Sequence, residues 1–349
     1  MNLYRRSVTA EFAQPSPEVT ATRRSQSAAT AAKGSGAEIA GVLGSWILSP
    51  SEAEREGAER GAEPVFAQLY AGGFAVTLTA MRSFITLLLL ASTVFADLKT
   101  NIEFAKVGDV SLTLDANVPE GPGPFPTVIL VHGGGWMRGD KQTFIKPLFA
   151  PMTKAGFTWF TINYRLAPAH RWPACADDVE RAIRWVKANA KQFKADPKRI
   201  ALVGESAGGH LVSYVGVRGA GDTSVAAVVP IYAPHDLESH AKGRNALGPS
   251  LSALFGLTEL NDEAVKQLRA ASATSYLRKG LPPFLQLHGT KDAQVDYAQS
   301  VKFQERMRAL GNTCDFITIP DGAHGIGGWD KLVPDYAEQL TAWLRKTLN

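Results

Sequence analysis

The chain has 349 residues, of which 45% are hydrophobic and 20% are charged, an ordinary balance for a globular protein with enough apolar material for one core. Its formal net charge of +4 is small, and two arginine pairs near the N-terminus, at 5–6 and 23–24, carry much of the excess. Because the sequence has no basic helix and no alternation of basic with aromatic residues, it argues against a nucleic acid partner.

The N-terminal part of the chain carries two different signals. Residues 1–80 are rich in Ala, Ser, Gly and Glu and lack sustained apolar periods, which predicts an unstructured segment. Residues 81–96 begin with Met-Arg-Ser, continue with an apolar run too short to span a bilayer, and end in alanine, which is typical of a secretory signal peptide. We therefore expect translation to start at Met81, residues 1–80 to be an upstream extension, and 97–349 to form one secreted or periplasmic domain without a membrane association.

Strand and helix patterns alternate along this predicted domain. Residues 110–117 alternate apolar and polar side chains, which predicts an antiparallel strand with one wet face. Short apolar runs, typical of strands buried on both faces of a parallel sheet, follow at 127–131, 157–162, 200–203, 225–232, 284–287 and 316–319. Helical patterns lie at 174–190, 211–217, 298–310 and 332–344. The alternation predicts an α/β protein with a mostly parallel, doubly wound sheet and helices on both faces.

The segment 236–276 interrupts this rhythm. Glycines and a proline divide it into weak helical pieces, at 243, 248, 249 and 256. Such an insertion is either a small lid or rim over a site or a plain surface excursion.

The two cysteines, Cys175 and Cys314, are too few for a disulfide framework. We expect Cys175 in a loop that approaches a helix and Cys314 in a strand, both half-buried and unpaired. An exported protein could pair them, and the sequence leaves that question open.

A run of three glycines follows the predicted strand 127–131, in the sequence His-Gly-Gly-Gly-Trp. Glycines let the backbone approach a substrate and point N–H groups at it, which the stabilisation of an oxyanion requires. Gly133 and Gly134 are the predicted donors, Gly135 is the next candidate, and Trp136 is a candidate substrate contact. A flexible turn is the alternative, whereas a phosphate loop would need a Gly-Lys-Ser/Thr ending that is missing here.

Residues 204–209 read Gly-Glu-Ser-Ala-Gly-Gly after a short apolar strand and before a helical pattern. This is typical of a nucleophile elbow, in which Gly204 and Gly208 are required because a Cβ at either position would collide with backbone. The turn would present the hydroxyl of Ser206 and place the N–H of Ala207 at a helix N-terminus, where negative charge is favoured.

An acid and a base follow this serine in the order that the motif requires. Asp292 comes just after the predicted strand 284–287 and is preferred over Asp296, which we interpret as capping the next helix. His324 is the one histidine after Asp292 and lies in a glycine-lined loop after another strand. Ser206, His324 and Asp292 therefore form a predicted nucleophile, base and acid.

The remaining histidines have no assigned chemical role. His132 and His210 belong to the glycine and serine motifs and are interpreted as orienting backbone. The other four are interpreted as surface or supporting residues, at positions 170, 235, 240 and 288. Neither these histidines nor the cysteines have the spacing of zinc ligands, so we expect no metal and no cofactor.

With these motifs, residues 107–346 resemble α/β-hydrolases of the hormone-sensitive-lipase-like esterases, and especially secreted bacterial carbohydrate and feruloyl esterases. Other matching segments are Asn-Tyr-Arg-Leu-Ala-Pro at 163–168, Trp-Pro-Ala at 172–174 with the aspartates at 177–178, and Ala-His-Gly at 323–325. The lipase-like members carry a long N-terminal cap, and this chain departs from that pattern. The resemblance implies a serine esterase with an open site for short-chain or aromatic esters, acetyl or feruloyl, on small molecules or carbohydrates.

Three other functions remain as alternatives. Prolyl-peptidase-like enzymes share the elbow but need a propeller-sized region that is missing here. Formamidases share the glycine loop followed by tryptophan, and the export signal argues against them. A non-catalytic binding protein of esterase fold would have lost a member of the triad, and here none is lost. The sequence does not indicate an oligomeric state.

Overall fold

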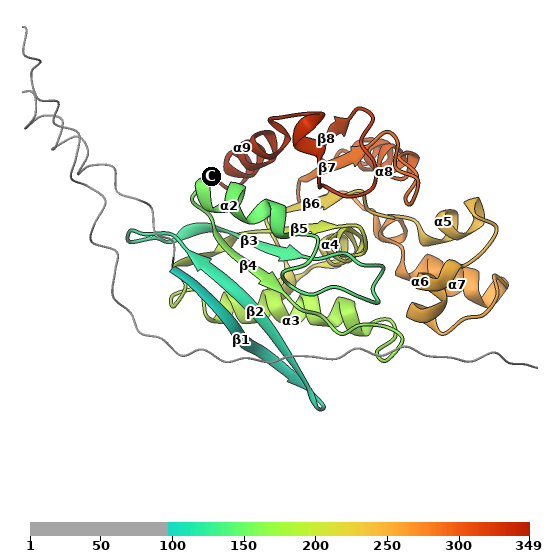
Figure 1. The fold of residues 1–349 in the computed structure, drawn as a ribbon, viewed down its shortest axis with the longest axis horizontal. Helices are drawn as coiled ribbons and strands as arrows, with labels where there is room; N and C mark the ends of the chain where they lie inside the picture. Colours follow the sequence, from blue (N-terminus) through green and yellow to red (C-terminus); the bar gives the residue numbers. More distant parts are fainter. Residues whose placement is uncertain (1–96) are drawn as a thin grey trace, which may run out of the picture. The chain divides into compact units, whose positions relative to one another are not determined.

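The computed structural model describes residues 97–349, which form an eight-stranded sheet with helices on both faces (Figure 1). The strand order is β1-β2-β4-β3-β5-β6-β7-β8; β1 pairs antiparallel with β2, β2 pairs antiparallel with β4, and the other pairs are parallel. The strands are β1 (Asp97–Val107), β2 (Val110–Val118), β3 (Phe125–Val131), β4 (Thr158–Ile162), β5 (Ala195–Glu205), β6 (Ala227–Ile231), β7 (Phe284–Gly289) and β8 (Cys314–Ile319). The predicted mostly parallel α/β sheet is confirmed.

The helices occupy the intervals between the strands. They are α2 (Phe149–Lys154), α3 (Ala174–Ala188), α4 (Ala207–Arg218), α5 (Leu237–Gly243), α6 (Gly248–Phe255), α7 (Asp262–Ala271), α8 (Ala298–Ala309) and α9 (Tyr336–Leu348), with short 3₁₀ turns at Lys146–Leu148, Gly221–Thr223, Ala273–Tyr276 and Trp329–Lys331. None of the helices in the described range is long and apolar enough to cross a membrane. The predicted upstream extension and signal peptide, residues 1–96, lie outside the described residues.

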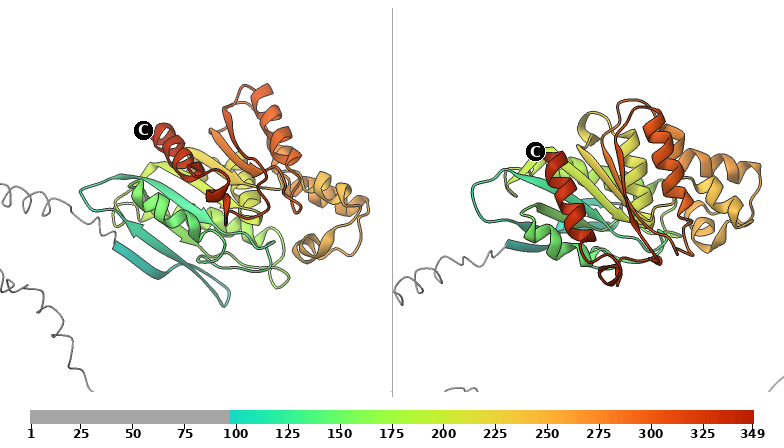
Figure 2. Two further views of the ribbon diagram at one scale, coloured as in Figure 1. Left: turned by 45° about the horizontal axis from the view of Figure 1, so that its top comes forward. Right: turned by 90° about the horizontal axis from the view of Figure 1, so that it is seen from above.

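The sheet separates two hydrophobic cores. Along β3, Ile129 and Val131 pack into one core while Val128 and Leu130 pack into the other, as expected when successive side chains point to opposite faces. The first core is covered by α3, α4 and α8, and the second by α2 and α9. Figure 2 shows α9, the red helix that ends at the C-terminus, across this second face of the sheet. The central strands are therefore buried on both faces, which is why their sequences are continuous apolar runs.

The structure corrects several predicted boundaries. Strand β1 was not predicted, because two register shifts between β1 and β2 break its alternation of apolar and polar residues. Helix α4 begins at Ala207, where the nucleophile elbow predicts a helix N-terminus, and so extends the apolar helical pattern at 211–217 by four residues through Gly208 and Gly209. Helix α9 begins at Tyr336 and not at residue 332, after a turn that contains Pro334. Helix α2 was also not predicted.

The cysteines differ from the prediction in burial. Cys175 lies in the first turn of α3 and not in a loop, and Cys314 begins β8 as expected. Both are free and at most 1% exposed, not half-buried.

The segment between β6 and β7 contains α5, α6, α7 and the 3₁₀ turn that ends at Tyr276. We call residues 237–276 the helical insertion. Its apolar side chains, among them Leu251 and Leu268, continue the core that α3 and α4 cover. Figure 1 shows it beside the end of the sheet where β5 and β6 finish. It is therefore a packed part of the domain at the edge where the functional residues gather.

Candidate active site

Ser206 lies on a tight turn between β5 and α4. Its backbone has φ 54° and ψ −117°, a conformation that L-residues rarely adopt. A Cβ on Gly204 would collide with the Gly208 carbonyl, and one on Gly208 would collide with the carbonyls of Val131 and His132. The predicted strand-turn-helix geometry, and the reason for its two glycines, are confirmed. The turn is held in place because Ser206 N–H donates to the Ile231 carbonyl at 2.9 Å.

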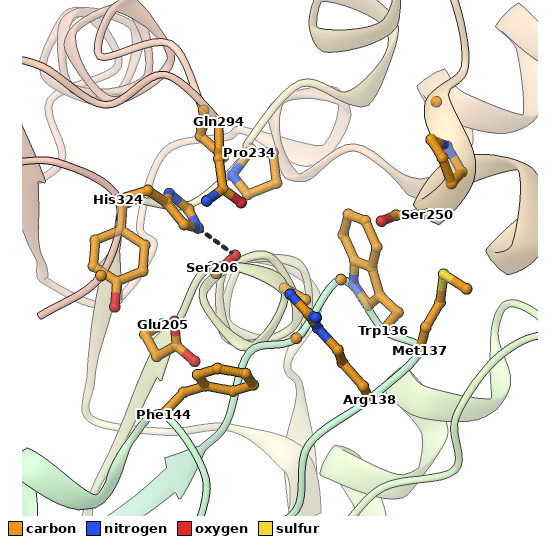
Figure 3. A pocket seen from close by; sticks show the side chains of 18 of the residues that line it. Trp136, Met137, Arg138, Phe144, Glu205, Ser206, Pro234, Ser250, Gln294 and His324 are labelled. Atoms are coloured by element: carbon orange, nitrogen blue, oxygen red, sulfur yellow. Dashed lines mark hydrogen bonds between the residues drawn. The ribbon is translucent and has the colours of Figure 1, made fainter. Parts of the chain in front are cut away.

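The three residues predicted as nucleophile, base and acid meet at this turn. Nε2 of His324 lies 2.9 Å from Oγ of Ser206, and Nδ1 of His324 lies 2.7 Å from Oδ2 of Asp292 (Figure 3). Asp292 follows β7 and His324 follows β8, so both come from the carboxyl ends of neighbouring parallel strands. The structure brings together residues that are separated by 118 and 32 positions in the chain.

The carboxylate of Asp292 is surrounded by hydrogen-bond donors. Its Oδ1 accepts from the N–H groups of Gln294 and Val295, each at 2.8 Å, and its side chain is fully buried. Burial alone would raise the pKa of Asp292, but hydrogen bonds from His288, His324 and Val295 N–H lower it far below the ordinary value. Asp292 is therefore ionised at neutral pH and keeps the proton of His324 on Nδ1.

His288 is a supporting residue whose contact the sequence did not reveal. It is buried at the end of β7, with Nε2 3.2 Å from Oδ2 of Asp292 and 3.0 Å from the Val295 carbonyl. Both are acceptors, so Nε2 carries a proton and donates to them. Nδ1 lies 2.8 Å from Oγ of Ser300. The signal available in the sequence was a histidine four residues before the predicted acid.

Asp296, the rival candidate for the acid, lies beside the start of α8. Its Oδ1 accepts a hydrogen bond from Ala298 N–H at 2.9 Å. This agrees with the interpretation that Asp296 caps the next helix. Tyr297 occupies the formal N-cap position, so the predicted position is one residue off.

The glycine loop requires a correction to the predicted oxyanion donors. The N–H of Gly133 donates to Oε1 of Glu205, so it is already engaged. Gly134 and Gly135 line the cleft next to Ser206, and no acceptor within residues 97–349 bonds their N–H groups. Ala207 also lines the cleft, and as the first residue of α4 it has no intrahelical partner for its N–H. The available donors are therefore Gly134, Gly135 and Ala207.

Glu205, immediately before the candidate nucleophile, forms hydrogen bonds with two other segments of the site. Its carboxyl group accepts from Gly133 N–H and from the hydroxyl of Tyr232, which in turn accepts from Ile326 N–H at 3.1 Å. Burial raises the pKa of Glu205, and the hydrogen bonds from Tyr232 and Gly133 oppose that shift. The ring of Tyr232 lies 4.6 Å from that of His324. Glu205 thus connects the glycine loop, the elbow and the His324 loop.

Trp136 lines the cleft but is only 4% exposed. Its indole N–H donates to Nδ1 of His210 at 3.2 Å, and Nε2 of His210 then donates to the Ala271 carbonyl at 2.9 Å. Burial lowers the pKa of His210 to about 4, so it is neutral at physiological pH. Trp136 is therefore mainly a packed support for the loop, with one edge toward the cleft.

The other histidines divide between support and cleft. His132 Nδ1 contacts the Gly133 carbonyl at 2.8 Å, in agreement with a backbone-orienting role. His235 is buried and bonded to Gln286, so it is not a surface residue. His240 lines the cleft from α5. Within residues 97–349 no group of three or more His, Cys, Asp or Glu side chains could hold a metal ion.

Ser206 opens into a cleft of about 900 Å³. One side consists of the glycine loop and the 138–147 segment, and another consists of the helical insertion, which contributes His240, Arg244 and residues 247–251. Figure 3 shows Ser206 and His324 facing this space, with Trp136 and Ser250 across from them. The segment predicted as a lid or rim therefore forms one wall of the cleft.

The comparison with protein families identifies the chain. Residues 114–307, more than half of it, match the BD-FAE family. The chain belongs to this family. Esterase LipC and Esterase LipQ of Mycobacterium tuberculosis (strain ATCC 25618 / H37Rv) are 32% identical over 214 residues and 33% identical over 210 residues. These alignments cover 58% and 57% of this chain and 53% and 50% of the relatives, so the chain spans about half the length of the curated relatives it matches.

The fold is also similar to those of solved esterase structures. A truncated carbohydrate esterase from gut microbiota superposes with a TM-score of 0.65 at 27% identity and covers 74% of this chain and 98% of that one. Thermogutta terrifontis esterase 2 with bound propionate gives 0.57 at 26% identity, covering 72% and 92%. The same esterase phosphorylated by paraoxon gives 0.54 at 26% identity, covering 72% and 91%. The resemblance to α/β-hydrolase esterases is confirmed for fold and family.

Proposed function

We propose that this BD-FAE family member is a serine carboxylesterase with Ser206 as nucleophile, His324 as base and Asp292 as acid. The observation that carries the proposal is the continuous hydrogen-bonded path from Asp292 through His324 to Ser206, next to N–H groups of the glycine loop for which residues 97–349 offer no acceptor. The curated relatives and structural neighbours, which are named as esterases, support it.

The first step forms an acyl-enzyme. Nε2 of His324 takes the proton of Ser206 while Oγ attacks the ester carbonyl, and the negative oxygen of the tetrahedral intermediate accepts hydrogen bonds from the glycine loop and Ala207. Asp292 stabilises the imidazolium that forms. His324 then returns the proton to the leaving alcohol, and the C–O bond breaks.

The second step releases the acid. Water gives a proton to His324 and attacks the acyl carbonyl, and the same N–H groups hold the oxyanion again. Collapse of this intermediate returns the proton to Ser206 and frees the carboxylic acid. The balance is one water consumed for each ester cleaved.

For the substrate, we propose short-chain or aromatic esters, of the acetyl or feruloyl type, on small molecules or carbohydrates. The volume of the cleft, about 900 Å³, supports a bulky alcohol, and a carbohydrate esterase is among the structural neighbours. We further propose that the enzyme is exported after cleavage behind Ala96. N-terminal sequencing of protein secreted by its native host should give Asp97 first, and a start well upstream would contradict export through this signal.

The activity is tested with p-nitrophenyl esters of increasing chain length, methyl ferulate and acetylated xylan. Ser206→Ala should lower kcat by about 10⁶ while the circular dichroism spectrum stays unchanged. Ser239→Ala, an exposed serine on α5, is the matched control and should retain full activity. Substantial turnover by Ser206→Ala would contradict the assignment of the nucleophile.

A further inference from the structure

The cleft around Ser206 has an unequal distribution of charge. Three cationic side chains line it, namely Arg138, Lys146 and Arg244, and all three are exposed. The one carboxyl group among the lining residues is that of Glu205. A cleft lined by charges of one sign concentrates its field and attracts ligands of the opposite sign.

Two of these cations are positioned by contacts with the protein. The guanidinium of Arg138 lies 5.9 Å from the centre of the Phe144 ring, and Figure 3 shows it extending from the glycine loop toward Ser206. Arg244, at the end of α5, donates to the carbonyl of Gln294, two residues after Asp292. One guanidinium therefore lies on each side of the cleft.

The acidic and titratable groups nearby do not neutralise these cations. Glu205 is only 4% exposed, and its carboxyl group is bonded to Gly133 and Tyr232. Asp292 is buried and bonded to two histidines. Within residues 97–349 none of the three cations forms an ion pair, so no carboxylate of this part of the chain neutralises their charge.

His240 does not add to this charge. Burial and the neighbouring Arg244 lower its pKa to about 4, so its imidazole is neutral when the enzyme works near pH 7. The positive charge of the cleft therefore belongs to Arg138, Lys146 and Arg244.

We propose that the cleft selects esters that carry a carboxylate close to the scissile bond, bound by Arg138 and Arg244 with help from Lys146. The proposal rests on the proposed esterase function and names its substrate class. A guanidinium can hold a carboxylate through two parallel hydrogen bonds, which fixes its orientation as well as its charge. Two sources share this chemistry: an acyl group on a uronic acid, where the alcohol side is charged, and a half-ester of a dicarboxylic acid, where the acyl side is charged.

Matched substrate pairs separate these two sources. The first pair compares the acetyl ester of a methyl glucuronide with that of methyl glucoside. The glucuronide carries a carboxylate where the glucoside carries a hydroxymethyl group. The second pair is the p-nitrophenyl half-ester of succinic acid against p-nitrophenyl butyrate. The readout is the ratio of kcat/KM for the anionic member to that for the neutral member of each pair.

We expect this ratio to exceed one in at least one pair, and that pair identifies the charged side. Arg138→Gln and Arg244→Gln should each lower the ratio about fivefold. This factor corresponds to the loss of one exposed ion pair at the upper end of the measured range of their energies. The control is the double variant Lys154→Gln/Lys191→Gln, which removes two exposed positive charges away from the cleft and should leave the ratio unchanged.

Salt gives a second readout on the same proteins. Raising the ionic strength from about 0.01 M to 1 M shortens the screening length from about 30 Å to 3 Å, so the wild-type ratio should fall. The ratio of a double variant, Arg138→Gln/Arg244→Gln, should change less. Equal ratios in wild type and both arginine variants, in both pairs, would overturn the proposal. Hydrolysis of the neutral members by wild type, but not by Ser206→Ala, shows in the same assay that the esterase function stands even if the anion preference fails.

Discussion

On one side of the cleft, the reacting groups lie at the carboxyl ends of β5, β7 and β8, and buried backbone contacts fix their positions. Ser206 cannot move without breaking its bond to the Ile231 carbonyl, and Asp292 is held by four donors. On the other side, the helical insertion contributes exposed side chains, among them Arg244 and Pro249. Under the proposed function, the rigid sheet edge sets the chemistry, whereas the choice of substrate depends on exposed side chains that can be exchanged at small cost. We therefore expect substitutions on the sheet side to lower kcat strongly, and substitutions on the insertion side to change the preference among esters.

The largest effect in this series is expected at the acid. Asp292→Asn should lower kcat by about 10⁴, because asparagine cannot hold His324 in the tautomer that accepts the serine proton. Steady-state hydrolysis of p-nitrophenyl acetate measures this loss. Asp296→Asn, at the start of α8, is the matched control, and an equal loss in that variant would contradict the assignment of the acid.

The same variant tests the lowered pKa of Asp292. A carboxylate whose pKa is lower in the folded than in the unfolded protein contributes stability that is present above about pH 4 and is lost as the pH falls through the folded value. The difference in free energy of unfolding between wild type and Asp292→Asn should therefore shrink below about pH 4. Urea denaturation at a series of pH values measures it, and a difference that stays constant in acid would argue against the lowered pKa.

A smaller loss is expected at the glycine loop. Gly134 has φ 99°, and a Cβ there would collide with the carbonyl of Arg138, so Gly134→Ala must shift the loop and its N–H groups. We expect kcat to fall by about 10² to 10³ with a small change in KM, because the donors act mainly in the transition state. Gly243→Ala, where a Cβ has open space, should behave as wild type. An unchanged kcat in Gly134→Ala would remove this loop from the oxyanion site.

His288 is expected to act through Asp292. His288→Phe removes one donor from the carboxylate and should lower kcat about tenfold, as the loss of a hydrogen bond to a charged group does. With one donor fewer, the negative charge of Asp292 attracts the proton of His324 more strongly and favours the imidazolium. The acidic limb of the kcat/KM profile should therefore move to higher pH. His288→Gln, which keeps an N–H donor, should restore part of the activity. A lower kcat without a shift of the acidic limb of the pH profile would mean that His288 only supports the fold.

The smallest effect is expected on the insertion side. Ser250, on α6, lies directly against Gly135 at the border of the cleft, since a Cβ on that glycine would lie 2.7 Å from Oγ of Ser250. Ser250→Phe should narrow the cleft and lower kcat/KM for the octanoyl relative to the acetyl ester of p-nitrophenol by about tenfold. The exposed Ser239→Phe on α5 is the control. A comparable loss of acetyl ester hydrolysis in Ser250→Phe would show that the insertion also positions the reacting groups, which would break the comparison between the two sides.

The same division explains what the sequence could predict. The proximity of Ser206, Asp292 and His324 could be predicted because each follows a buried strand, and parallel strands bring their carboxyl ends to one edge. Gly204 and Gly208 were interpreted correctly because only glycine avoids the backbone at those positions.

Contacts between segments that are distant in the sequence could not be predicted, because local sequence patterns do not contain them. The bond between Glu205 and Gly133, which removes a predicted oxyanion donor, joins residues 72 positions apart. The contacts of Tyr232 and the placement of Arg138 and Arg244 around one cleft also depend on how loops fold back over the sheet. The bulged strand β1 was missed because its alternation of side chains is interrupted.

The central claim is that Ser206 is a nucleophile activated by its neighbours. Paraoxon, which phosphorylates Thermogutta terrifontis esterase 2, offers a direct measurement. Intact-protein and peptide mass spectrometry after treatment should find one diethylphosphoryl group per chain, on Ser206, and none on the Ser206→Ala protein. Labelling of another residue, or an unlabelled wild-type protein that is fully folded, would contradict the account.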